Sequence, residues 1–266
     1  MIKLYHNDLS SCAQKVRIAL YEKQIPWTSC HLNLRTGDQF DPAYLKLNAN
    51  GVVPTLVHDG VAVIESNIIL EYIEDAFPEP SLRPKDPAAL AMMRLWFQQL
   101  DAKVHGWVGI LTMAISTRHE YLAQGPDGVA KAVDQSPDVN KRRFKRALIE
   151  LGVEAPFFAE AVIDVDKFLG KMDEALAHTG WLAGDAYSIA DIALAPYIAR
   201  INFLGLAPFW ADRPNLLAWF ERISARPSFR KAIIDDVAPK RVADLIANGA
   251  QMSERLLELR AGMKAA

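Results

Sequence analysis

The stretch of sequence that decides the fold is Ser10–Leu20, SSCAQKVRIAL. It follows a short alternating apolar run, Ile2–Tyr5, which is typical of a buried strand. Within it, Val16, Ala19 and Leu20 fall at helical spacing, so the sequence predicts a strand, a loop and a helix in quick succession. Two hydroxyls and a thiol therefore lie at a helix N-terminus, where unpaired N–H groups and the helix dipole favour negative charge. This position suits the binding of a thiolate.

The composition describes an ordinary globular protein with no sign of a nucleic-acid partner. The chain has 266 residues, enough for a sizeable core and two domains, and its formal net charge is only −2. Cys12 and Cys30 lack metal-ligand or paired-redox spacing, so we expect no metal site and a reducing, cytoplasmic location. No leader pattern opens the chain, and the best apolar run, Ile192–Ile201, is broken by Pro196 and Arg200. We therefore expect no membrane association.

The pattern along the chain divides it into a mixed domain, a linker and a helical domain. Residues 1–77 predict a βαβ unit followed by a small αββα unit, which is the order of an α/β thioredoxin-like domain. Residues 78–87 are rich in proline and have the composition of an interdomain linker. Residues 88–266 have helical periodicity, so we expect an α/β thioredoxin-like N-terminal domain plus an all-α C-terminal domain. The expected elements of the second domain are helices at about 88–121, 141–177, 190–203, 216–225, 227–235 and 240–263, with a polar segment over 124–140.

Two dipeptides, Val53-Pro54 and Glu65-Ser66, lie where a thioredoxin-like domain brings them beside the start of the first helix. A proline in a strand favours an edge or a cis peptide bond, and a cis bond would turn the Val53 N–H and C=O toward an extended peptide. Glu65 and Ser66 offer a carboxylate for an ammonium and donors for a carboxylate. Each motif by itself also fits an ordinary cap, edge strand or helix start. Together they match the sulfur and the γ-glutamyl group of glutathione.

The chain resembles the cytosolic glutathione transferase superfamily over essentially its whole length. Ser10–Leu20 is similar to the signature of the zeta class, the maleylacetoacetate isomerases, and Val53–Leu56 and Glu65-Ser66 resemble the family's cis-proline and γ-glutamyl positions. Ser188–Asp191 resembles the family's capping motif, and its spacing predicts a capping box rather than a catalytic pair. The resemblance implies a cytoplasmic homodimer that uses glutathione as co-substrate and acts on a small hydrophobic electrophile.

The resemblance also assigns residues to glutathione. Ser10 would carry the hydroxyl that binds the sulfur, with Ser11 or Cys12 as its neighbours. The other implied residues are Gln39 for the glycyl end, Val53 and Pro54 for the cysteinyl part, and Glu65 and Ser66 for the γ-glutamyl end. A helix N-terminus and a hydroxyl donor would lower the pKa of the bound thiol by about two units, which favours its attack on an electrophilic carbon.

Residues for the electrophile are predicted from position. Leu9 comes just before Ser10 and could form one wall, while Asp101 and His105 share one face of a predicted helix and could border the cleft. Asp101 and His105 are equally compatible with solvent-exposed polar positions.

Two stretches depart from the zeta pattern. Thr36–Gln39 lacks the usual double glycine, and about 120–154 is inserted where the isomerases have a short connection. This insertion, with Leu82–Pro87 and Trp219–Pro227, resembles bacterial transferases related to lignin β-etherases. The leading hypothesis is therefore a detoxifying glutathione transferase. The alternatives are β-aryl-ether cleavage or cis-trans isomerisation with glutathione, a thiol reductase with Cys12 as nucleophile, and a non-catalytic binding protein.

Overall fold

The structure is a computed structural model that describes residues 1–135 and 138–265. It divides into two compact units, each assembled from separate parts of the sequence. Unit 1 comprises residues 1–98, 175–196 and 218–239, and unit 2 comprises residues 99–174, 197–217 and 240–266.

A small mixed sheet forms the centre of unit 1, in the order β2-β1-β3-β4. The strands are β1 (Ile2–His6), β2 (Trp27–His31), β3 (Thr55–His58) and β4 (Val61–Val63). β1 runs parallel to β2 and antiparallel to β3, with Tyr5 opposite Thr55, and β4 is antiparallel to β3. Burial alternates along β1 as the sequence pattern indicated. The predicted thioredoxin-like sheet is confirmed.

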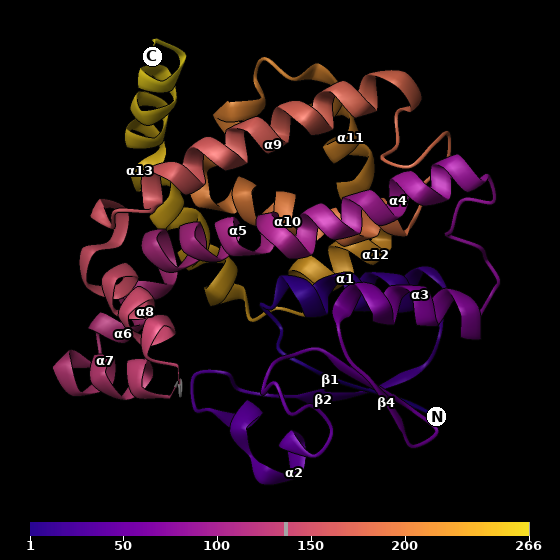
Figure 1. The fold of residues 1–266 in the computed structure, drawn as a ribbon, viewed down its shortest axis with the longest axis horizontal. Helices are drawn as coiled ribbons and strands as arrows, with labels where there is room; N and C mark the ends of the chain where they lie inside the picture. Colours follow the sequence, from indigo (N-terminus) through magenta and orange to yellow (C-terminus); the bar gives the residue numbers. More distant parts are fainter. Residues whose placement is uncertain (136–137, 266) are drawn as a thin grey trace. The chain divides into compact units, whose positions relative to one another are not determined.

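Helices cover both faces of this sheet. α1 (Ser11–Glu22) and α3 (Ser66–Ala76) lie along one face, whereas α2 (Pro42–Leu45), preceded by the 3-10 turn η1 (Asp38–Phe40), lies by the other (Figure 1). Every residue from Ala13 to Leu20 of α1 is buried, including two charged side chains. The remaining parts of unit 1 include α4 (Pro87–Gln99), α12 (Pro227–Arg230) and the π-helical turn η7 (Lys231–Asp235).

The predicted capping box is present in unit 1, at the start of α10 (Ile189–Ile201). The Ser188 hydroxyl accepts a hydrogen bond from Ala190 N at 3.3 Å and donates to Asp191 Oδ2 at 3.0 Å. The fully buried Asp191 carboxylate also accepts hydrogen bonds from the backbone N–H groups of Ser188 and Leu182 and from Trp219 Nε1. This carboxylate therefore fixes the helix start against a neighbouring loop and α11 (Pro214–Ser224).

One helical run opens unit 2. It continues from α4 through η2 (Leu100–Val104), α5 (His105–Thr112), η3 (Met113–Thr117) and α6 (Arg118–Leu122). The sequence predicted this run as one regular helix over 88–121, but η2 and η3 are π-helical. A π turn places an extra residue in the helix and rotates everything after it, which a pattern of 3.6-residue period does not indicate.

The inserted segment is more helical than the sequence predicted. The polar stretch over 124–140 contains α7 (Gly125–Asp134), although residues 136–137 of that stretch lie outside the described part of the chain. The predicted helix over 141–177 is two helices, α8 (Val139–Leu151) and α9 (Phe158–Thr179), because Gly152 adopts a φ of +58° and Pro156 follows. α6, α7 and α8 share a small apolar core of Tyr121, Val129, Ala132, Val133 and Ile149.

The C-terminal helix α13 (Pro239–Ala265) crosses the chain at η5 (Asn202–Leu206) in unit 2. A Cβ atom at Gly205, whose φ is +86°, would lie 2.2 Å from Gly249 O, and one at Gly249 would lie 2.4 Å from Phe203 O. The two backbones are therefore in direct contact.

One helical stretch, Ile189–Trp210, is long and apolar enough to cross a membrane by length and composition. In the protein, 72% of the most apolar part of this stretch is buried. We therefore interpret it as a core helix.

Candidate active site

The predicted glutathione residues follow strand ends that meet at one edge of the sheet. His6 at the end of β1 pairs with His31 at the end of β2, and Tyr5 pairs with Thr55 at the beginning of β3. The end of β4 reaches the same edge, because Val63 pairs with Leu56. The segments that leave β1, β2 and β4 here carry Ser10, Gln39 and Glu65, and the segment that enters β3 carries Val53. The topology of unit 1 therefore brings the four segments to one place.

The loop between β1 and α1 is held by hydrogen bonds on both sides of Leu9. Asn7 Nδ2 donates to Leu32 O at 2.9 Å, and the Asn7 and Asp8 side chains both accept from Leu9 N. The fully buried Arg17 donates from Nη2 to Asp8 O at 2.8 Å. This bonding fixes the backbone that leads into Ser10.

Ser10 is the N-cap of α1. Its Oγ accepts a hydrogen bond from Ala13 N at 3.3 Å, with φ −68° and ψ 116°. Because the oxygen is the acceptor in this bond, the hydroxyl proton is available to donate to an anion in front of the helix. Ser11 and Cys12 occupy the first turn and, like Ser10, are partly exposed. The three predicted residues therefore lie together at a helix N-terminus of the kind that binds anions.

A buried lysine joins this turn to α3. Lys15 is fully buried, and its Nζ donates to Asn67 Oδ1 at 2.6 Å. Asn67 Nδ2 in turn donates to Phe97 O at 3.3 Å. The sequence analysis missed this pair. Gln14, Lys15 and Arg17 alternate with apolar residues in α1, and such polar positions are usually read as solvent-exposed, so the sequence contained no signal for this pair.

The Val53-Pro54 peptide bond is cis, as predicted. Both residues are buried, and Val53 lies outside the ladder that begins with the Tyr5–Thr55 pair. The preceding loop is fixed by Asn48 Nδ2, which donates to Val52 O at 3.0 Å. The hydrogen bond to Val52 O therefore fixes the backbone that leads into Val53 and the start of β3.

Glu65 has an unusual backbone conformation. Its φ is +65° and its ψ 111°, which a residue with a side chain adopts only at a cost. Its side chain is exposed, and Ser66, the first residue of α3, is buried. Strain of this kind at a helix start is characteristic of residues that hold a ligand.

Gln39 lies in η1 and is nearly fully buried. Its Oε1 has no hydrogen-bond partner among the described residues. A buried acceptor without a donor is costly, which makes Gln39 Oε1 a candidate to accept a hydrogen bond from a ligand.

The residues predicted for the electrophile belong to different units. Leu9 is in unit 1, whereas Asp101 in η2 and His105 in α5 are in unit 2. Both Asp101 and His105 are exposed, and His105 Nδ1 lies 3.0 Å from the Tyr197 hydroxyl. Their role in binding the electrophile stays a prediction.

Comparison with known proteins identifies the family. The N-terminal domain of the glutathione S-transferases matches residues 4–81, and their C-terminal domain matches residues 155–222. The chain belongs to the glutathione S-transferase family. It is therefore an enzyme with glutathione as co-substrate, and the predicted family, fold and activity are confirmed.

Several bacterial relatives are similar over nearly their whole length. Protein LigF of Sphingobium sp. is 29% identical to this transferase over 86% of the chain and 92% of LigF. The tetrachloro-p-hydroquinone reductive dehalogenase of Sphingobium chlorophenolicum is 29% identical over 87% of the chain and 95% of the relative. The crystal structure of β-etherase LigF superimposes with a TM-score of 0.77 and 27% identity, over 88% of the transferase and 99% of LigF. The predicted likeness to β-etherase-type transferases is confirmed.

Proposed function

We propose that Ser10 is the residue that holds the glutathione sulfur as a thiolate in this transferase. The proposal rests on the N-cap geometry. Ser10 Oγ accepts a hydrogen bond from Ala13 N, so the Ser10 hydroxyl proton can donate to the glutathione sulfur. Backbone N–H groups and the helix dipole add to this donor and lower the pKa of a bound thiol. Ser10 gives up no proton in this role, because it acts as a donor to the anion.

The remaining parts of the tripeptide are assigned from the fixed backbone around the sheet edge. The Val53 N–H and C=O, presented by Pro54, would pair with the cysteinyl part as an added strand does. Glu65 and Ser66 would bind the γ-glutamyl ammonium and carboxylate, and Gln39 would bind the glycyl end. The unpartnered Gln39 Oε1 is an acceptor that the glycyl N–H could satisfy, and the positive φ of Glu65 also supports this assignment.

Glutathione supplies the sulfur nucleophile. The sulfur–carbon bond forms at an electrophilic carbon while the bond to the leaving group breaks, and the leaving group departs with the electron pair. The α1 N-terminus and Ser10 stabilise the sulfur anion until that bond forms. The electrophile class that we favour is a small aromatic compound with an ether or halide leaving group, because LigF and the reductive dehalogenase are similar to this chain over most of their length.

Single substitutions distinguish Ser10 from its neighbours. The variants Ser10→Ala, Ser11→Ala and Cys12→Ala would be compared by the ultraviolet absorbance of bound thiolate against pH and by conjugation of 1-chloro-2,4-dinitrobenzene. We expect Ser10→Ala to raise the thiol pKa and lower kcat/KM by about a hundredfold, with small effects in the other two. A large loss only in Cys12→Ala, accompanied by thiol reductase turnover, would replace the proposal with the cysteine mechanism.

Cleavage of a β-aryl ether is the second candidate, supported by the TM-score of 0.77 to LigF. Incubation with a model β-aryl ether and glutathione would release one phenol and form one thioether per turnover. If chlorodinitrobenzene reacts and the ether does not, the transferase proposal holds and the etherase assignment fails.

We further propose a cytoplasmic homodimer with domain boundaries at 1–77, 78–87 and 88–266. In unit 1, β4, α3 and α4 carry exposed apolar side chains that could meet a second copy, namely Val61, Ile68, Met92 and Leu95. Light scattering coupled to size-exclusion chromatography should give twice the monomer mass for the native protein. The Ile68→Asp variant should give a lower mass, because a charge would weaken the dimer contact. A monomeric native protein would reject the dimer.

A further inference from the structure

A dense run of cations lies on α8, in the inserted segment of unit 2. The function proposed above uses none of its members, which are Lys141, Arg142, Arg143, Lys145 and Arg146. Figure 1 shows α8 beside α6 and α7, with which it shares an apolar core. Leu148 and Ile149 are buried on the core side of the helix, so the opposite side of α8 faces solvent.

Two of the five cations are bound by neighbouring groups. Lys145 Nζ donates to Ala132 O at 2.7 Å and lies 5.0 Å from the Tyr121 ring centroid. Arg146 Nη1 lies 3.2 Å from Glu150 Oε1. The other three side chains form no ion pair with a carboxylate in the described part of the chain, and all are exposed or partly exposed. These three are Lys141, Arg142 and Arg143.

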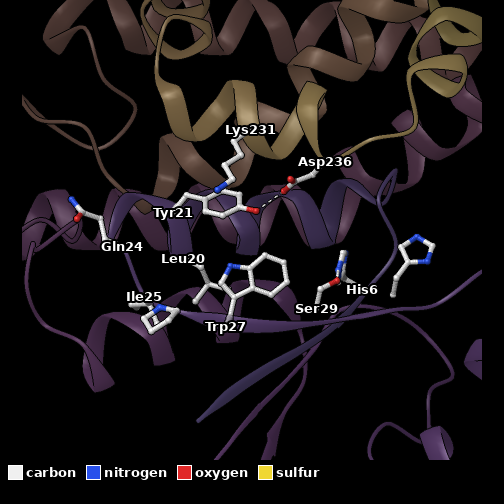
Figure 2. Close-up of a pocket in the computed structure, with 11 residues that line it drawn as sticks. His6, Leu20, Tyr21, Gln24, Ile25, Trp27, Ser29, Lys231 and Asp236 are labelled. Carbon is white, nitrogen blue, oxygen red and sulfur yellow. Dashed lines mark hydrogen bonds between the residues drawn. The ribbon is translucent and has the colours of Figure 1, made fainter.

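The run on α8 lacks the charge compensation seen in unit 1. There the Tyr21 hydroxyl donates to Asp236, a bond drawn as a dashed line in Figure 2, and Asp236 Oδ2 also lies 3.8 Å from Arg17 Nε. On α8, by contrast, Lys141 and Lys145 are four residues apart, and like charges at this spacing repel each other. An anion supplied from outside the chain would reduce this repulsion.

Apolar side chains lie beside the cations on the exposed side of α8. Positions 140, 144, 147 and 151 form one stripe along the helix, in which Phe144 is 41% exposed and Leu151 is 51% exposed. The Phe144 ring stacks on Phe157, with the ring centroids 4.2 Å apart, and is thereby held at the surface. The neighbouring stripe, at 139, 143, 146 and 150, carries Arg143. A basic stripe next to exposed apolar groups is typical of helices that bind a membrane surface.

We propose that this face of α8 docks on a membrane surface rich in anionic phospholipid headgroups. The three cations without a carboxylate partner contact lipid phosphates, while Phe144 and Leu151 enter the headgroup layer beside them. A lipid surface accepts both kinds of side chain at once along the length of the helix, which favours it over a purely acidic protein segment. Such a contact is peripheral and requires neither a leader nor a spanning helix, so the sequence features that argue against membrane association do not bear on it.

The test measures sedimentation of the full-length protein with lipid vesicles. One preparation contains equal parts of phosphatidylglycerol and phosphatidylcholine, and the other contains phosphatidylcholine alone. We expect binding to the anionic vesicles only. Raising the ionic strength from about 0.1 M to about 1 M shortens the Debye length from about 10 Å to about 3 Å, so binding should fall by about tenfold or more.

Two triple variants locate the charged part of the contact. Replacing the three α8 cations by glutamine should weaken binding by about a hundredfold, because each cation near an anionic surface contributes about fivefold. The control removes the same charge from three exposed lysines elsewhere in unit 2 and should weaken binding by less than about threefold. These control substitutions are Lys103→Gln, Lys167→Gln and Lys171→Gln.

A second pair of variants tests the apolar part. Phe144→Ala should weaken vesicle binding by about threefold to tenfold, whereas Leu217→Ala, at an equally exposed position on α11, should leave it unchanged. Conjugation of 1-chloro-2,4-dinitrobenzene should equal that of the native protein in both α8 variants, since none of the substituted residues belongs to the proposed glutathione site. The result is thereby independent of the fate of the proposed transferase mechanism.

Three results would overturn the proposal. The first is equal binding to both kinds of vesicle, which would remove any role for headgroup charge. The second is an equal loss in the two triple variants, which would assign binding to the overall charge rather than to α8. The third is no sedimentation with anionic vesicles together with binding of a polyglutamate peptide that the α8 triple variant abolishes, which would replace the lipid surface by an acidic protein partner.

Discussion

The Lys15 ammonium lies 2.6 Å from the side-chain oxygen of Asn67, and the lysine side chain is fully buried. Through this bond the second turn of α1 is fixed to the first turn of α3. Ser10 is the residue before α1, and Glu65 is the residue before α3. This buried hydrogen bond therefore helps to set the spacing between the proposed sulfur site and the proposed γ-glutamyl site.

Replacing Lys15 by Met should affect both stability and ligand binding. The loss leaves Asn67 Oδ1 without its donor, so we expect the free energy of unfolding to fall by about 1–3 kcal/mol. Glutathione affinity, measured by calorimetry on folded protein, should fall as well. Lys46→Met, at an exposed position, should change neither quantity. Unaltered glutathione affinity in a folded Lys15→Met protein would show that the bond has no part in positioning the ligand.

Replacing Glu65 by Gly should lower the affinity for glutathione without lowering the free energy of unfolding. Glycine adopts a φ of +65° without the steric cost that glutamate carries, which offsets its greater loss of backbone entropy on folding. We expect stability to be unchanged or higher by up to about 1 kcal/mol, and glutathione affinity to drop. Glu65→Ala, which lacks the carboxylate but keeps the strain, is the matched control. It should lose affinity without gaining stability in urea unfolding.

Replacing Asp191 by Ala should be among the more damaging changes in unit 1. The buried N–H groups of Leu182, Ser188 and Trp219 would all lose their acceptor. We expect a loss of about 3–5 kcal/mol in urea unfolding, against less than about 0.5 kcal/mol for the exposed Asp185→Ala. A loss below 1 kcal/mol would mean that water or a rearranged loop satisfies these donors.

Acid should destabilise the protein through His6. Its pKa is lowered from 6.5 to about 4, chiefly by burial and then by Arg17, so the unfolded chain binds a proton that the folded chain does not bind between these values. The resulting contribution to stability is fully present above pH 6.5 and is lost as the pH falls toward 4, by at most about 3 kcal/mol. Urea unfolding at several pH values measures this slope.

The contribution of His6 can be separated from that of other groups. His6→Gln should flatten the stability profile between pH 6.5 and 4, whereas the exposed His119→Gln should leave its slope as in the native protein. An equally steep profile in His6→Gln would assign the acid sensitivity to carboxylates.

Local signals were enough to predict much of the proposed glutathione site. Ser10 caps a helix and Ser188 with Asp191 forms a capping box, as neighbouring residues indicated. Each of these two features is set within a few residues of the chain, so the sequence pattern carries it, whereas the local pattern at Val53-Pro54 allowed either an edge strand or the cis bond that the structure has. The resemblance to a known family suggested which distant loops share one site. Local patterns could not, because these loops come together only through the pairing of the strands.

Features that depend on distant partners escaped prediction. Lys15 and Arg17 looked like the polar positions of a half-exposed helix, yet both are fully buried because Asn67 and the backbone oxygens of Asp8 and Ala232 receive their hydrogen bonds. The π turns η2 and η3 shift the helical phase without any glycine or proline to mark them. α7 was missed because Gly125, Pro126 and Gly128 suggest a loop, although Val129, Ala132 and Val133 form an apolar face that packs in the core shared with α6 and α8.

The crossing of Gly205 and Gly249 lets α13 approach η5 until their main chains touch, because neither position carries a side chain. The buried Leu245 and Leu256 lie on α13 to either side of Gly249. A single added methyl group at either glycine would collide with main-chain atoms, which cannot rotate away. Any residue with a side chain at Gly205 or Gly249 would therefore force the α13 backbone away from η5.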